Sequence, residues 1–158
     1  MRISVPILVT LFLSIGCASS PDVKNEIVWD EITAQVPTGM SQIYVVRPEK
    51  LASSANRFII TINDEPVAAM KTGTYFWHHV PAGQTHLTAK TEPNILNFGL
   101  ALAFMSKPEI EIETEAGSIY FVQVDVGFSG GPKLVILDPS QGEKFVNNAR
   151  ESKELPSQ

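Results

Sequence analysis

The chain has 158 residues, of which 44% are hydrophobic and 18% are charged, and it contains a single cysteine. This length suits one ordinary domain and is too short for two full ones, and the hydrophobic fraction excludes wholesale disorder. The formal net charge of −5 argues against nucleic-acid binding, because a protein that binds phosphate backbones needs a basic face. One cysteine excludes an intramolecular disulfide and a cysteine-based zinc site.

The first 17 residues have the pattern of a secretory signal peptide. Met1 and Arg2 give a short positive start, and an apolar run follows from Ile3 to Ile15. As a helix this run would span roughly 20 Å, which is too short for a bilayer core of about 30 Å. We therefore interpret it as the apolar region of a signal peptide, not as a permanent transmembrane helix.

The only cysteine, Cys17, directly follows this run in the segment Leu13-Ser14-Ile15-Gly16-Cys17. The segment resembles the lipobox of bacterial lipoproteins. The resemblance implies that Cys17 carries two or three acyl chains, palmitate among them, and chains in that number give stable membrane attachment. Ala18 stands where an aspartate would favour the inner membrane. The resemblance therefore implies the inner leaflet of the outer membrane, with the domain facing the periplasm.

Residues 18–41 are predicted to form a tether and lead-in, because they begin with small and polar residues. From 42 to 138 the hydrophobic period is close to two, which favours β-strands. The expected strands cover 42–47, 58–62, 66–70, 75–80, 85–90, 109–113, 118–126 and 133–137. About eight short strands with turns between them indicate an all-β fold, an antiparallel β-sandwich of seven or eight strands.

Two finer expectations follow from the same pattern. The pair Asn63-Asp64 predicts a hairpin over 57–70, and residues 139–158 are predicted to form a short C-terminal helix with Ser140 as its N-cap, followed by a tail. Alternation along the strands selects nine core candidates: Ile43, Val45, Ile60, Ile62, Ile110, Ile112, Ile119, Phe121 and Val135.

Several short motifs between Gln42 and Leu137 resemble, in order and spacing, a family of bacterial lipoproteins known as domain of unknown function 2846. The motifs are Ile43-Tyr44-Val45-Val46-Arg47-Pro48, Ile62-Asn63-Asp64-Glu65-Pro66-Val67, Gly73-Thr74-Tyr75-Phe76, Val80-Pro81-Ala82-Gly83-Gln84-Thr85-His86 and Ala116-Gly117-Ser118-Ile119-Tyr120-Phe121-Val122. The resemblance implies a lipid-anchored β domain and no particular activity.

Three histidines, His78, His79 and His86, fall within nine residues. If Ala82-Gly83 form the turn of a hairpin, His79 faces His86 with Cβ atoms about 4.5–5.5 Å apart, close enough to share a metal ion. The hairpin holds no third ligand at a spacing typical of zinc enzymes. We therefore expect no metal and no other cofactor, and we keep a metal-assisted envelope hydrolase that uses His79 and His86 as the alternative function.

No other segment predicts catalysis, and we expect that the protein is not an enzyme. The run Phe128-Ser129-Gly130-Gly131 lacks the frame of a serine nucleophile on a sharp turn. The row Glu109, Glu111, Glu113 and Glu115 is typical of a solvated or edge-protecting strand face. Arg47 ends a strand before Pro48, and we expect it at the surface.

Two apolar features are candidates for a binding surface. Tyr75, Phe76 and Trp77 are consecutive, so a side chain such as Trp77 either packs in the core or stacks on a sugar or a peptide. Residues 94–106 are uncharged and carry Phe98 and Phe104, which either close the core or form an exposed contact. We expect a binding or assembly module that meets the membrane through Cys17 and has an envelope protein or a glycan as its partner.

Replacing Phe98 and Phe104 together by serine separates the two alternatives for residues 94–106. If the rings close the core, which we favour, the double variant loses several kcal/mol of stability, because each buried aromatic side chain lost typically costs about 3–5 kcal/mol. Thermal unfolding measures this loss. If the rings form an exposed contact instead, the melting temperature holds and binding to liposomes or to a partner falls.

Overall fold

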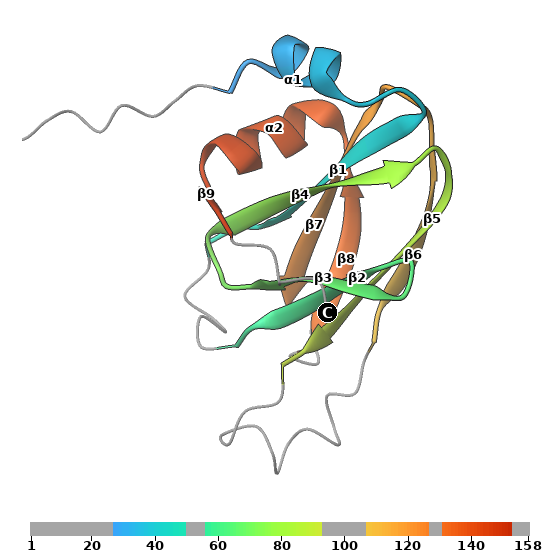
Figure 1. The fold of residues 1–158 in the computed structure, drawn as a ribbon. Coiled ribbons are helices and arrows are strands. Elements are labelled where there is room, and N and C mark those ends of the chain that lie inside the picture. Colours follow the sequence, from blue (N-terminus) through green and yellow to red (C-terminus); the bar gives the residue numbers. More distant parts are fainter. Residues whose placement is uncertain (1–26, 50–55, 93–106, 127–130, 153–158) are drawn as a thin grey trace, which may run out of the picture.

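The computed structural model describes residues 27–49, 56–92, 107–126 and 131–152 (Figure 1). Within these ranges the chain forms two helices and nine strands. In chain order they are α1 (Trp29–Gln35), β1 (Met40–Arg47), β2 (Phe58–Ile62), β3 (Glu65–Met70), β4 (Thr74–Pro81), β5 (Gly83–Thr91), β6 (Glu109–Thr114), β7 (Ile119–Val126), β8 (Pro132–Leu137), α2 (Pro139–Asn147) and β9 (Arg150–Glu151).

The strands form two sheets packed face to face as a β-sandwich (Figure 1). Sheet A has the order β8-β7-β1-β4-β9, and sheet B has the order β3-β2-β5-β6. Most neighbouring strands are antiparallel, whereas the pairs β1–β7 and β4–β9 are parallel. The predicted all-β sandwich with a short C-terminal helix is confirmed.

Two elements lie where the sequence predicts only a lead-in and a tail. The seven-residue helix α1 falls within 18–41, and the two-residue strand β9 follows α2 and pairs with Thr74 and Tyr75 of β4. Both are short and weakly patterned, so their formation depends on packing against sheet A rather than on local propensity. None of the helices among the described residues is long and apolar enough to cross a membrane.

The main hydrophobic core fills the space between the two sheets. Alternate residues of each strand point inward, as the period of two requires. The fully buried large side chains of this core include Ile43, Val45, Phe58, Ile60, Met70, Phe76, Leu87, Val122 and Val124. Five of the nine predicted core residues lie here and are buried, namely Ile43, Val45, Ile60, Ile62 and Ile112, and Ile110 packs against them partly buried.

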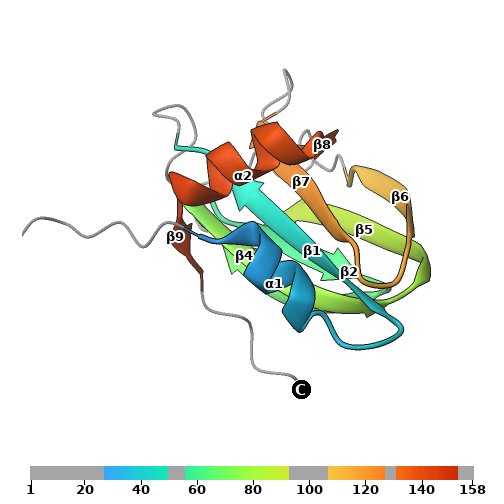
Figure 2. The same ribbon diagram turned by 90° about the horizontal axis from the view of Figure 1, so that it is seen from above.

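A second apolar cluster lies on the other side of sheet A, under the two helices (Figure 2). This outer-face cluster consists of the buried residues Tyr44, Val46, Phe121 and Val146 with partly buried neighbours that include Ile27, Trp29, Ile32, Tyr75 and Ile119. Phe121 and Ile119 therefore pack under the helices and not between the sheets. On β8 the prediction selected Val135 as a core residue, but Val135 is only partly buried. The neighbouring Leu134 is buried instead.

The predicted hairpin over 57–70 is confirmed as β2 and β3. Asn63 and Asp64 at its tip have φ values of 46° and 67°, the left-handed conformation that a two-residue hairpin turn of this kind requires. The tip is also tied to β5, because the Asn63 Oδ1 atom accepts a hydrogen bond of 2.9 Å from the backbone N–H of His86. This contact attaches the turn to the next strand of sheet B.

Helix α2 begins after Asp138, whose carboxylate accepts hydrogen bonds from the Gln141 backbone N–H at 3.2 Å and from the Ser140 hydroxyl at 2.7 Å. These bonds to the charged form lower the pKa of Asp138. Ser140 is therefore not the N-cap that the sequence predicts. The helix packs so closely on β7 that a Cβ atom at Gly142 would overlap the side chain of Phe121.

The change Gly142→Ala is expected to destabilise the fold by about 1–3 kcal/mol, because a methyl group has no space between α2 and Phe121. Urea unfolding measures the loss. Gln141→Ala is the matched control, since Gln141 is exposed on the same helix turn and should change stability by less than about 0.5 kcal/mol. Equal stability of the two variants would show that α2 does not pack on β7 in this way.

Candidate functional site

The outer face of sheet A is the most aromatic surface of the described chain. The Trp29 ring of α1 lies edge-on to Tyr44 and to Phe121, with ring centroids 5.1 and 5.2 Å away, and Tyr44 stacks on Phe121 at 5.5 Å. Tyr75 of β4 adjoins Tyr44 at 6.1 Å. Trp29 thus places α1 over the centre of the sheet (Figure 2).

Buried polar groups at this face include one hydrogen-bonded pair and one unpaired atom, since the buried Nε1 atom of Trp29 has no hydrogen-bond partner among the described residues. The Gln42 side-chain amide donates a hydrogen bond of 3.0 Å to the Tyr44 hydroxyl, and both side chains are buried. Burial, together with the nearby Tyr75 and Glu151, raises the pKa of Tyr44 to about 12. The phenol therefore remains neutral across the physiological range and serves as a hydrogen-bonding group, not as a base.

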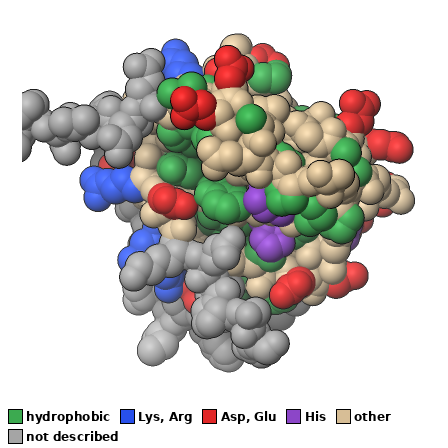
Figure 3. All heavy atoms as spheres, turned by 45° about the horizontal axis from the view of Figure 1, so that its top comes forward, with side chains coloured by type: hydrophobic (Ala, Val, Ile, Leu, Met, Phe, Trp, Pro, Cys, Tyr) green, Lys and Arg blue, Asp and Glu red, His purple; other side chains and the backbone are tan. Residues whose placement is uncertain are grey.

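Trp77 is the exposed continuation of this aromatic surface along β4. Its side chain is 36% exposed, and its ring centroid lies 5.1 Å from that of the partly exposed His79. Figure 3 shows histidine side chains at the surface beside hydrophobic ones. We call Trp77 and His79 the β4 aromatic pair. The sequence left open which aromatic residues of this strand pack in the core and which are exposed. Phe76 is buried in the core, and Trp77 is exposed.

The predicted pairing of His79 with His86 is wrong. His79 lies opposite Gln42 of β1 in sheet A, whereas His86 lies opposite Glu111 of β6 in sheet B. The chain does not return beside itself after Pro81 but crosses to the other sheet, where Gly83 adopts a φ of 127° that L side chains rarely take. The two imidazoles therefore do not form the metal-binding hairpin that the sequence suggests.

The acidic row has the structural role that its alternation predicts. Glu109, Glu111 and Glu113 are exposed along β6, which is an edge strand of sheet B. Glu111 accepts a hydrogen bond of 3.0 Å from Gln84, and Glu109 lies 3.5 Å from the His86 Nε2 atom. Among the residues that the structure describes, no group of three or more His, Cys, Asp or Glu side chains could hold a metal ion.

Three of the predicted site residues, Cys17, Phe98 and Phe104, lie outside the described residues, as does Ser129. The structure therefore places Trp77, His79 and His86 of the candidates, and it brings only Trp77 and His79 together.

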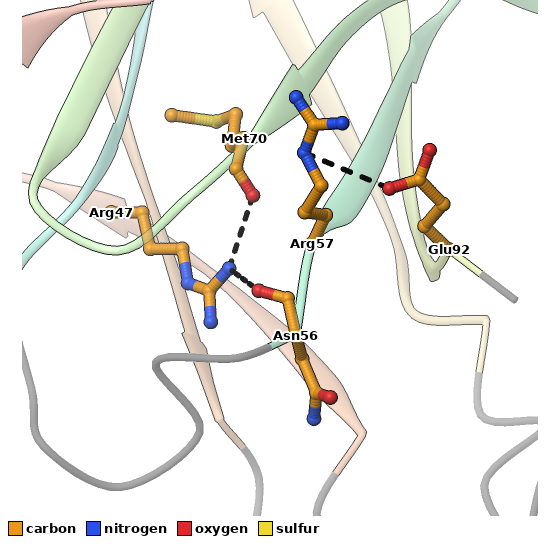
Figure 4. Close-up of polar contacts among 5 residues, drawn as sticks. All are labelled: Arg47, Asn56, Arg57, Met70 and Glu92. Carbon is orange, nitrogen blue, oxygen red and sulfur yellow. Dashed lines mark hydrogen bonds and ion pairs between the residues drawn. The ribbon is translucent and has the colours of Figure 1, made fainter. Parts of the chain in front are cut away.

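A feature that the sequence analysis misassigned is Arg47, which is buried with 2% exposure and not at the surface (Figure 4). Its Nη1 atom donates hydrogen bonds of 2.7 Å to the Asn56 carbonyl oxygen and 3.1 Å to that of Met70. The guanidinium carbon lies 4.1 Å above the centroid of the Phe58 ring. Arg47 lies on β1 of sheet A. Met70 and Phe58 lie on β3 and β2 of sheet B, and Asn56 lies just before β2, so the Arg47 side chain connects the two sheets.

The charge of Arg47 is held in a partly desolvated site. Burial lowers the pKa of Arg47, and the nearby Asp125 carboxylate opposes that shift. Planar guanidinium groups stack on aromatic rings and donate several hydrogen bonds at once, which suits them to such sites better than lysine. Arg57, close by, is exposed instead and pairs with Glu92 at 3.7 Å (Figure 4). Arg47 is thus a structural cation.

Replacing Arg47 by methionine is expected to cost about 3 kcal/mol of folding stability, because two carbonyl oxygens lose a charged donor. Chemical unfolding measures the change. The matched control is Arg57→Met, which breaks only a solvent-exposed ion pair and should cost less than about 1 kcal/mol. If both variants lose the same stability, the hydrogen bonds of Arg47 do not hold the sheets together.

The comparisons with known proteins identify a family and leave the activity open. No curated protein matches the sequence. The profile of the family described as protein of unknown function (DUF2846) matches residues 37–139, which run from just before β1 to the start of α2 and include all strands except β9. Because this match covers more than half of the chain, the protein belongs to the DUF2846 family.

Proposed function

We propose that this protein is a lipid-anchored lipoprotein of the cell envelope, where it acts as a non-enzymatic binding or assembly module. The observation that carries the proposal is the position of Cys17, the only cysteine, directly after a short apolar run and a glycine. Acylation of Cys17 places the module at the inner leaflet of the outer membrane, facing the periplasm.

The length of the intervening chain supports a module held close to the bilayer. Nine residues separate Cys17 from Ile27, the first described residue, and even a fully extended chain of that length reaches only about 30 Å. Ile27 itself packs into the outer-face cluster beside α1. The anchor therefore joins the domain on the helix-covered side of sheet A.

The binding role rests on the β4 aromatic pair. An exposed indole beside an imidazole inclined to it at 58° offers an apolar surface with a polar rim, and an exposed indole can stack on sugars and on peptide side chains. The alternative of a metal-assisted hydrolase loses its geometric basis, because His79 and His86 lie on different sheets. We therefore favour an envelope protein or a glycan as the partner over a hydrolysed substrate.

The change Cys17→Ser is expected to abolish acylation and to leave a precursor that still carries residues 1–16, because serine has no thiol to form the thioether. Labelling with a radioactive fatty acid and the electrophoretic mobility of the chain measure the two effects. Ser19→Ala is the matched control and should be labelled and processed like the wild type. A wild-type chain that takes up no label, together with a normally processed Cys17→Ser variant, would contradict the anchor.

A further inference from the structure

The exposed cations of the described residues gather at one end of the sandwich. β1, β3, β5 and β7 end there, and β2, β4, β6 and β8 begin there (Figure 1). We call it the lysine end. Of the seven exposed Lys and Arg side chains that the structure describes, only Lys144 of α2 lies elsewhere. The six at the lysine end are Arg57, Lys71, Lys90, Lys107, Lys133 and Arg150.

The opposite end of the sandwich carries negative charge alone. Its exposed carboxylates lie at the hairpin between β2 and β3, at the end of β6 and after β8. They belong to Asp64, Glu65, Glu113, Glu115 and Asp138. No Lys or Arg of the described strands and turns lies at that end. The sandwich is therefore electrically polar along its strands.

The lysine end keeps a positive balance in spite of its own carboxylates. With the buried Arg47 it holds seven cations against five carboxylates, a net charge of +2, and the carboxylates are those of Glu49, Glu92, Glu109, Asp125 and Glu151. Glu92 pairs with Arg57 at 3.7 Å. Among the described residues no ion pair involves the end lysines, a name that we use for Lys71, Lys90, Lys107 and Lys133.

The connections at this end that lie outside the described residues do not alter that balance. They are residues 50–55, 93–106 and 127–130, and Lys50 is their only charged residue. Whatever path these connections follow, their sequence adds positive charge and no carboxylate. The charge of the lysine end is therefore a property of the described strands and of the sequence together.

We infer that the lysine end faces the membrane and binds the phosphate groups of anionic lipid headgroups. Lysine ammonium groups bind phosphate as point charges, and an anionic leaflet attracts clusters of Lys and Arg close to its surface. Three end lysines belong to the strands of sheet B or directly adjoin them, and Lys133 belongs to sheet A. Cations spread over the ends of two sheets suit a flat charged surface better than a single small anion.

Salt screening decides whether the carboxylates of the opposite end oppose this orientation. β1, β4 and β7 have eight residues each, which separates the two ends by about 26 Å at a rise of roughly 3.3 Å per residue. The Debye length is about 10 Å in ~0.1 M salt. A charged surface at one end is thus largely screened from the other end. The charge of the nearer end determines the interaction, and the formal net charge of the whole chain does not.

The tether allows the lysine end to reach the bilayer, and in this respect the inference rests on the anchor proposed above. Ile27 packs on the outer face of sheet A, so each end of the sheet lies within about one strand length of it. Nine residues between Cys17 and Ile27 span up to about 30 Å. The anchor alone therefore permits either end to face the membrane, and the charge of the two ends selects between them.

Lysine reactivity on vesicles tests the inference. The full acylated chain is reconstituted in vesicles of phosphatidylcholine, with or without about 30% phosphatidylglycerol, and mass spectrometry follows the acetylation of each lysine. We expect the end lysines to react at least about fivefold more slowly in the anionic vesicles. Lys144 on the same molecule is the internal control and should change by less than about twofold. Salt at about 0.5 M should remove the protection, because it shortens the Debye length to about 4 Å.

A charge reversal separates binding by the lysine end from a general effect of charge. Lys71→Glu should reduce the protection of the other three end lysines by at least about threefold. Lys144→Glu changes the net charge equally and should leave that protection as it is in the wild type. Both side chains are exposed, so the two melting temperatures should agree with that of the wild type. If Lys71→Glu fails to fold, the comparison of salt concentrations on the wild type still decides.

Four results would overturn the inference. Three of them are equal reactivity in neutral and anionic vesicles, protection of Lys144 to the same degree as the end lysines, and protection that persists in about 0.5 M salt. The fourth is protection of the end lysines by inorganic phosphate in neutral vesicles, beyond that given by chloride at the same ionic strength. That result would indicate a discrete phosphate site and not a lipid surface.

The anchor and the lysine end fail in different ways. Flotation of the chain with neutral phosphatidylcholine vesicles reports the anchor alone, because these vesicles carry no net charge. A chain that floats but shows no protection in anionic vesicles contradicts the lysine end and leaves the anchor intact. A chain that does not float with neutral vesicles contradicts the anchor. Flotation with the anionic vesicles then tests the lysine end directly, and its absence there contradicts the inference as well.

Discussion

Burial of β1 on both faces is the constraint on which the rest of the structure depends. Ile43 and Val45 point into the core between the sheets, while Tyr44 and Val46 point to the opposite side. A strand in that position needs a covering layer on each face, because its exposed apolar side chains would otherwise remain in water. Sheet B covers one face, and α1 and α2 cover the other. The helices are thus a requirement of the central strand and not an addition to the sandwich.

At the end of β1, the buried side chain of Arg47 links sheet A to residues of sheet B. A buried cation is costly unless it is hydrogen-bonded, and Arg47 is bonded to the carbonyl oxygens of Asn56 and Met70 and stacked on Phe58. These contacts cross from sheet A to the segment that begins β2 and to the end of β3. The same side chain therefore ends one strand and fixes the separation of the two sheets.

Local sequence signals predicted the strands and the hairpin at Asn63-Asp64, because period-two alternation and turn residues act over a few positions. These local signals gave wrong predictions where a residue's position depends on how the chain passes between the two sheets. The turn after Pro81 has the composition of a hairpin, yet it carries the chain to the other sheet and separates His79 from His86. Phe121 was correctly predicted to be buried, but alternation cannot show that helices, and not the second sheet, cover it. Arg47 was placed at the surface because nothing within a few residues of it signals its carbonyl partners.

The same two-sided covering determines where large apolar side chains of the described residues reach water. Most of the outer face of sheet A lies under α1 and α2, and the exposed residues of β6 on sheet B are carboxylates. Large apolar side chains of the described residues reach water around these covered faces, at Val28 before α1, at Trp77 of β4 and at Ile136 of β8. Trp77 lies opposite Tyr44 in the register of β4 and β1, so it borders the aromatic face that α1 covers. The anchor that we propose at Cys17 would join the domain on this same face through Ile27, so the proposed binding surface at Trp77 and the proposed anchor would share one side of sheet A.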